Sequence, residues 1–132
     1  MAAAEYNFTI EQGSSYTTSF IYKNSDNNPI DLTGWCARMI LTTSDNQTIV
    51  YSSDNQEVSQ YKMTIDDANG KIVLMIPSDI TNVFTFKTAR YDLELESNDA
   101  LYSGGGNYVT RILYGKITIV KRNSLNPTAM EC

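Results

Sequence analysis

Apolar and polar residues alternate without a break over residues 91–96. Three apolar side chains fall on one side and three carboxylates on the other: Tyr91, Leu93 and Leu95 against Asp92, Glu94 and Glu96. A period of two residues is typical of a β-strand with one buried face. Residues 109–120, rich in β-branched and aromatic side chains, predict a second strand after a glycine-rich loop. We therefore expect a long antiparallel hairpin whose apolar face is covered by a second layer of structure.

Further strand-like segments precede the hairpin, spaced by roughly ten residues and separated by polar turns. They cover residues 6–11, 16–22, 35–41, 47–52, 61–65 and 71–76. About eight strands in total predict an all-β fold, an antiparallel sandwich or barrel, and the short strands and frequent turns favour the sandwich. Residues 78–84 predict one short helical turn with Ser78 as its cap.

The chain has 132 residues, which fits a single domain large enough to bury a core without metals or disulfides. We divide it into an N-terminal arm over residues 1–5, a β-sandwich over residues 6–122, and an extended C-terminal tail over residues 123–132. The tail shows no periodicity and contains Pro127. The N-terminus lacks the features of a signal peptide, and no apolar stretch approaches the ~18 residues of a membrane span.

Two segments carry specific predictions about the core. Alternation along residues 35–41 predicts four inward-facing side chains: Trp35, Ala37, Met39 and Leu41. We interpret Trp35, the largest of them, as part of the core rather than as a platform for a ligand. Residues 71–76 are apolar on both faces, which predicts a central strand or one covered by a neighbouring subunit.

Composition excludes several functional classes. The chain contains no histidine, so it has no serine–histidine–aspartate or cysteine–histidine catalytic site and no histidine-ligated metal. The net charge is −5 and the ten basic residues are scattered, so we expect no nucleic-acid partner. Cys36 and Cys132 are expected to be unpaired thiols in a reducing compartment, although a bridge between them stays open. We expect no cofactor and no membrane partner.

The acidic ladder, formed by Asp92, Glu94 and Glu96, is a candidate site. Alternate carboxylates on a strand lie about 7 Å apart, a spacing that suits paired acid and base groups or a Ca²⁺ site. We favour a solvated or partner-facing strand surface, because nothing else in the sequence marks a pocket. Three strand arginines are expected to pair with the ladder or with a neighbouring chain: Arg38, Arg90 and Arg111.

Two glycine-containing segments are interpreted as turns. Asp67, Asn69 and Gly70 overlap part of a calcium-loop pattern, but Ser78 stands where the terminal glutamate of that pattern would be. Residues 104–106 are three glycines without the lysine of a phosphate-binding loop, and they predict the tip of the hairpin.

Besides contact with partner proteins, two other functions stay open for this chain. The first is a carbohydrate-binding module or adhesin that recognises a host surface glycan through exposed tyrosines. The tyrosines expected to be exposed are Tyr51, Tyr61, Tyr102 and Tyr108. Tyrosine is also enriched at protein–protein interfaces, so this pattern does not separate the two roles. The second alternative is a small hydrolase that uses the acidic ladder.

A series of short motifs follows the predicted strands and turns. The motifs are Gln12-Gly13, Asp31-Leu32-Thr33-Gly34, Ala37-Arg38-Met39, Asp67-Ala68-Asn69-Gly70-Lys71-Ile72, Ile76-Pro77, Tyr91-Asp92-Leu93-Glu94-Leu95, and the run from Arg111 to Ile119. In their order and spacing, the chain resembles small structural proteins of tailed bacteriophages. It is similar to the N-terminal domain of phage upper-baseplate proteins, and the resemblance covers residues 8–120.

The resemblance implies an immunoglobulin-like β-sandwich without enzyme activity, built into the tail or baseplate of a virion after synthesis in the host cytoplasm. The implied partners are other tail or baseplate proteins and further copies of the chain in a ring. The tail over residues 123–132 is a candidate arm that a neighbour binds. The interface candidates are Arg38, Asp92, Glu94, Glu96, Arg111, Asn123 and Pro127.

Overall fold

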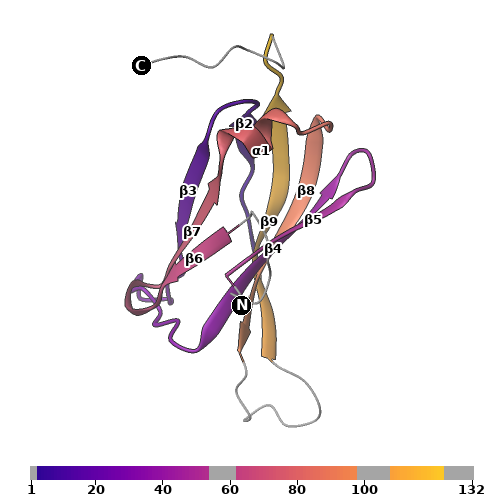
Figure 1. The fold of residues 1–132 in the computed structure, drawn as a ribbon. Coiled ribbons are helices and arrows are strands. Elements are labelled where there is room, and N and C mark those ends of the chain that lie inside the picture. The colour runs from indigo at the N-terminus through magenta and orange to yellow at the C-terminus, as the bar shows by residue number, and fades with distance from the viewer. Residues whose placement is uncertain (1–2, 54–61, 98–107, 124–132) are drawn as a thin grey trace, which may run out of the picture.

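The fold is a two-layered β-sandwich (Figure 1). A computed structural model describes residues 3–53, 62–97 and 108–123. The strands in these residues are β1 (Ala4–Glu5), β2 (Phe8–Glu11), β3 (Tyr16–Ile21), β4 (Trp35–Thr43), β5 (Thr48–Ser52), β6 (Lys62–Asp66), β7 (Lys71–Ile76), β8 (Thr88–Ser97) and β9 (Tyr108–Val120). The short helical segments are η1 (Asp67–Asn69) and α1 (Ser78–Asn82). The predicted all-β sandwich is confirmed, and each predicted strand segment overlaps an observed strand.

Strand order assigns the elements to the two layers. The first layer runs β9-β8-β4-β5, with β1 and β2 both paired to the outer edge of β9, and the second runs β6-β7-β3. A single pair, Ser52 with Lys62, links β5 to β6 and so joins the layers. The second layer occupies the places of strands B, E and D of an immunoglobulin-like sandwich, and β9, β8 and β4 those of G, F and C. The expected antiparallel pairing holds except where β1 and β2 run parallel to β9 and at the β5–β6 link.

The core lies between the layers and is centred on the predicted hairpin, β8 with β9. Inward-facing residues of β8 are matched across the sheet to those of β4 in the pairs Ala37–Leu95, Met39–Leu93 and Leu41–Tyr91. All six are at most 3% exposed, which confirms the predicted inward faces of both strands. Trp35 is only partly buried, because it is the first residue of β4 and packs against the end of the core rather than its centre.

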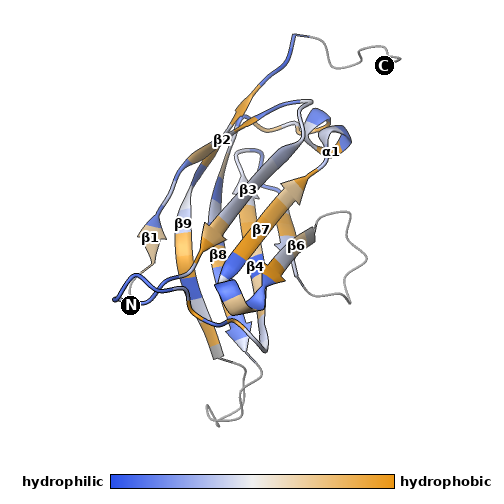
Figure 2. Ribbon diagram, turned by 90° about the vertical axis from the view of Figure 1, so that its left-hand side faces the viewer, coloured by the Kyte–Doolittle hydropathy of each residue, from blue (hydrophilic) through white to orange (hydrophobic). Residues whose placement is uncertain are grey.

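Strand β7 is central in the second layer, as its apolar sequence predicts (Figure 2). Its inner residues Ile72, Leu74 and Ile76 are fully buried. On its outer face Met75 is 56% exposed, because no described element covers this side of the layer.

The helical turn after β7 forms as expected, but its cap differs. Pro77 occupies the N-cap position, and its carbonyl oxygen accepts the N–H groups of Ile80 and Thr81. Ser78 is the first helical residue and makes no side-chain capping bond, so the predicted role of Ser78 is wrong. Proline lacks a backbone N–H and has a fixed φ, which suits it to the start of a helix.

The predicted N-terminal arm contributes a strand. Ala4 and Glu5 pair with Leu113 and Tyr114, so the sandwich begins earlier than residue 6. Next to this strand the backbone of Tyr6 passes directly over Gly115, where a side chain would overlap the Tyr6 carbonyl oxygen. The same carbonyl accepts a hydrogen bond from the hydroxyl of Tyr91, a group whose pKa burial raises well above its usual range. The hydroxyl therefore stays protonated and available as a donor.

Gln12 is a buried polar side chain that ties three segments together. Its Nε2 donates to the carbonyl oxygens of Asn82 and Phe84, and its Oε1 accepts the N–H of Arg122. Gln12 is only 5% exposed, so its amide makes these hydrogen bonds where water has little access, and the Phe84 carbonyl also accepts a bond from Nζ of Lys121. Gln12 thereby holds the end of β2 against the α1–β8 connection and the end of β9.

Replacing Gly115 with alanine should destabilise the fold by about 3 kcal/mol, because the new methyl group meets backbone rather than a movable side chain. Urea denaturation measures the change. Gly34→Ala is the control: its φ is positive but the surrounding space is open, so about 1 kcal/mol is expected from strain alone. Equal losses in the two variants would contradict the close approach of Tyr6 to β9.

Gln12→Leu should cost about 2 kcal/mol, because the Asn82 carbonyl and the Arg122 N–H would lose their hydrogen bonds with the amide, while the Phe84 carbonyl would keep its bond from Lys121. The free energy of unfolding should fall at every pH, since the amide does not titrate. Gln47→Leu, at an exposed turn, should change it by less than about 0.5 kcal/mol. A Gln12→Leu protein as stable as the wild type would show that these groups find water instead.

Candidate interaction surface

The side of the first layer that faces away from the core is the candidate site, and we call it the outer face. It is built from alternate residues of β5, β4, β8 and β9, whose register sets them in rows. One row is Ser52, Arg38, Glu94 and Arg111, and the next is Val50, Ile40, Asp92 and Tyr114. The structure therefore brings the acidic ladder together with two of the three predicted arginine partners.

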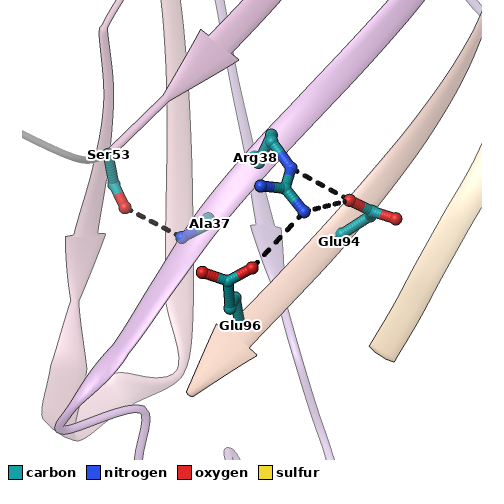
Figure 3. A network of polar contacts seen from close by, with 5 residues as sticks. All are labelled: Ala37, Arg38, Ser53, Glu94 and Glu96. Carbon is teal, nitrogen blue, oxygen red and sulfur yellow. Dashed lines mark hydrogen bonds and ion pairs between the residues drawn. The ribbon is translucent and has the colours of Figure 1, made fainter. Parts of the chain in front are cut away.

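Arg38 is held by two carboxylates of the ladder (Figure 3). Its Nε and Nη2 both donate to Oε1 of Glu94, at 3.0 and 2.7 Å, and Nη2 lies 3.6 Å from Oε1 of Glu96. The hydrogen bonds to Glu94 raise the pKa of Arg38 further above its already high value, so the pair stays ionised. The Arg38 side chain is 37% exposed and the Glu94 side chain 22%, so the pair is partly shielded from water.

Arg111 completes the network on β9. Its Nη1 donates to Oδ1 of Asp92 at 3.1 Å, and its guanidinium lies 5.1 Å from the ring centre of Tyr114. A bulge between Leu93 and Glu94 shifts the pairing by one residue and sets Arg111 opposite Glu94. The guanidinium of Arg111 nevertheless forms its ion pair with Asp92. The predicted pairing of Arg38 and Arg111 with the acidic ladder is confirmed.

Arg90 does not pair with a described carboxylate. It stands directly opposite Lys116 across the β8–β9 pair, and both are exposed. Like charges in opposite positions weaken a sheet slightly, and the pair gives one end of the outer face a positive potential. The two residues share a shallow hollow with the hydroxyl groups of Thr42, Ser44 and Thr88. Only strand register reveals this pair, since the two residues lie far apart in the sequence.

Apolar side chains lie among the charges of the outer face. Val50, Val109 and Tyr114 are 37–43% exposed, and Ile40 is half-buried between them. Cys36 is also exposed, as a free thiol at the start of β4. Mixed apolar and paired charged groups on a flat sheet suit a protein–protein contact, in which the paired charges fix orientation.

The carboxylates of the acidic ladder are engaged by arginines. Glu94 and Asp92 each bind a guanidinium rather than facing one another across a cavity. No group of three potential metal ligands occurs in the part of the chain that the structure describes. Nor do the described residues include a helix long and apolar enough to cross a membrane.

The two remaining interface candidates are Asn123 and Pro127. Asn123 is exposed beyond the end of β9, where it lines a groove with Val83, Lys121 and Arg122, away from the acidic ladder. Pro127 and the rest of the predicted tail beyond Asn123 fall outside the described residues.

Tyr51 is fully buried, so the expectation that it is exposed is wrong. It lies on β5 opposite Met39 and points into the core, while its neighbour Val50 points outward. Tyr61, Tyr102 and the side chain of Tyr108 lie outside the described residues. Of the four tyrosines proposed as sugar platforms, the one that the structure describes belongs to the core.

No protein-family model matches the chain, and no curated protein matches it.

A double-mutant cycle on Arg38→Ala and Glu94→Ala should give a coupling energy of about 0.5–1 kcal/mol, because two N–H groups of Arg38 donate to one oxygen of Glu94 and the pair is partly exposed. Urea denaturation at low and high salt measures it, and the coupling should weaken with salt. The same cycle on Arg90 and Lys116 should give a coupling of opposite sign. A zero value for the first pair would contradict the network in Figure 3.

Proposed function

We propose that this chain is a structural virion protein, a non-enzymatic assembly subunit of a bacteriophage tail or baseplate that is repeated in a ring. The observation that carries the proposal is the outer face, where an ordered ion-pair network is interleaved with exposed apolar side chains. Such a face is preorganised for binding another protein, because ion pairs already hold its charged side chains in position and these side chains lose little conformational entropy on binding.

The motifs behind the phage resemblance support the same role. Gln12 is the buried anchor between strands, and Gly70 adopts a positive φ where the backbone of Ile30 approaches closely. Asp31 accepts the N–H and hydroxyl groups of Thr33 in a tight turn. These positions shape the sandwich and its turns, so the resemblance concerns the architecture of an assembly module rather than a reaction centre.

Purified particles of the encoding virus provide the test. Quantitative mass spectrometry should find the chain at a fixed copy number that is a small multiple of three or six, against the tail-tube subunit as the internal standard. Absence from the particles would overturn the proposal. A glycan array would then test the carbohydrate-binding alternative.

A charge-reversal variant tests whether the outer face is the interface that holds the chain in the particle. Glu94→Lys places a third positive charge beside Arg38 and Arg111, and should lower incorporation into particles about tenfold or more, since like charges at an interface cost several kcal/mol. Thr64→Lys, on the exposed side of the second layer, is the matched control. Circular dichroism confirms that both variants fold. Normal incorporation of the Glu94→Lys protein would exclude the outer face as the interface.

A further inference from the structure

The second layer is narrower than the first on one side of the sandwich. The first layer is five strand positions wide, with β1 and β2 sharing the outermost, and the second is three wide. The two layers are joined through the β5–β6 pair. The difference in their widths therefore falls on the opposite side of the sandwich, next to β3. Immunoglobulin-like sandwiches of the constant type have a fourth strand beside strand B, which is the position next to β3.

Within the described residues, the edge of β3 that faces away from β7 is paired with no other strand. Tyr22 donates its N–H to the carbonyl of Gly70, on the side of β7. Because the β3–β7 register is unbroken, alternate residues face β7, and Thr17, Ser19 and Ile21 present their N–H and C=O groups to the free edge. Strand β3 carries no charge, proline or glycine, the features that usually protect an edge from further pairing.

The core is open along this edge. Inward-facing residues of β7 are at most 1% exposed, whereas Tyr16, Thr18 and Phe20 on the inner side of β3 are only half-buried. Tyr6, which packs edge-on against Phe20, is 46% exposed. An additional strand beside β3 would cover these side chains.

A cavity of about 200 Å³ lies at the end of β3. Lys23 and Arg111 are the cationic residues of the lining, and the other lining residues are Ala4, Phe20, Ile21, Tyr22, Ile112 and Leu113. Cavities of roughly 150 Å³ accept a benzene ring, so this one has room for a single large apolar side chain. Arg111 is engaged by Asp92, while Lys23 forms no ion pair with any described carboxylate.

We propose that the edge of β3 is a strand-acceptor site for an extended segment of a partner protein. The segment pairs with Thr17, Ser19 and Ile21, inserts one leucine, methionine or aromatic side chain into the cavity, and places a carboxylate beside Lys23. Main-chain hydrogen bonds supply affinity in this mode of binding, and the pocket and the charge supply specificity. The site holds whether or not the chain is a virion protein.

A partner segment fits better than a second copy of the chain. The first layer extends past β3 through β1 and β2. Two copies that joined their β3 edges around a two-fold axis would bring these overhanging strands into the same space. A single extended segment beside β3 adds one strand to the second layer and leaves β1 and β2 of the first layer in place.

The test uses the full chain and a displayed library of random heptapeptides. Enriched peptides should alternate apolar and polar residues and carry an acidic residue at one end. By NMR, they should slow hydrogen exchange at the amides of Thr17, Ser19 and Ile21, which exchange rapidly in the free protein. Peptides that leave these three amides unprotected would overturn the proposal. Protection that rises with protein concentration without peptide would overturn it in favour of a second copy.

Two pairs of variants sharpen the result. Ser19→Pro removes an N–H that points away from β7, so the sandwich keeps its own pairing while edge binding falls at least about tenfold; Ser19→Thr should bind normally. Lys23→Glu should weaken acidic peptides, whereas Lys87→Glu, an exposed charge outside the cavity, should not. Equal binding by the Ser19→Pro and Ser19→Thr proteins would place the peptides elsewhere.

Discussion

Strand β9 is paired along both of its edges, and the rest of the sandwich depends on this pairing. One edge is hydrogen-bonded to β8 over ten residues of β8, and the other to β1 and β2. The second pairing requires the backbone of Tyr6 to pass over Gly115, where no side chain fits. The glycine therefore allows the N-terminal segment to pair along the outer edge of the first layer. The Gln12 amide then joins the end of β2 to Arg122, just after the C-terminal end of β9.

The same pairing separates the molecule into surfaces with different character. On the outer face of β8 and β9, ion pairs within the sheet hold Arg38 and Arg111 in fixed positions among exposed apolar groups. At β3 the contrast is in the backbone, since uncharged residues present N–H and C=O groups that pair with no described strand, beside a cavity with mostly apolar walls. One surface is suited to recognition by side chains and the other to recognition by main-chain hydrogen bonds.

The charges of the outer face show how far sequence reasoning reached. Alternation over residues 91–96 was enough to place Asp92, Glu94 and Glu96 on one side of a strand, and to nominate Arg38 and Arg111 as partners. It could not identify the Arg90–Lys116 pair, because that depends on which residues of β8 and β9 stand opposite one another. The bulge after Leu93 shifts this register, and nothing in the local sequence marks it.

Local sequence determined the strands, the inward faces of β4 and β8, the central place of β7 and the helical turn after it. Each follows from a period of two residues or from turn chemistry, which act over a few neighbours. Tertiary structure alone decided that the first strands run parallel to the last, that Tyr51 is buried, that Trp35 lies at the end of the core, and that β3 is the outermost described strand of the second layer. These features depend on which strands become neighbours, and that choice is made by packing between segments far apart in the chain.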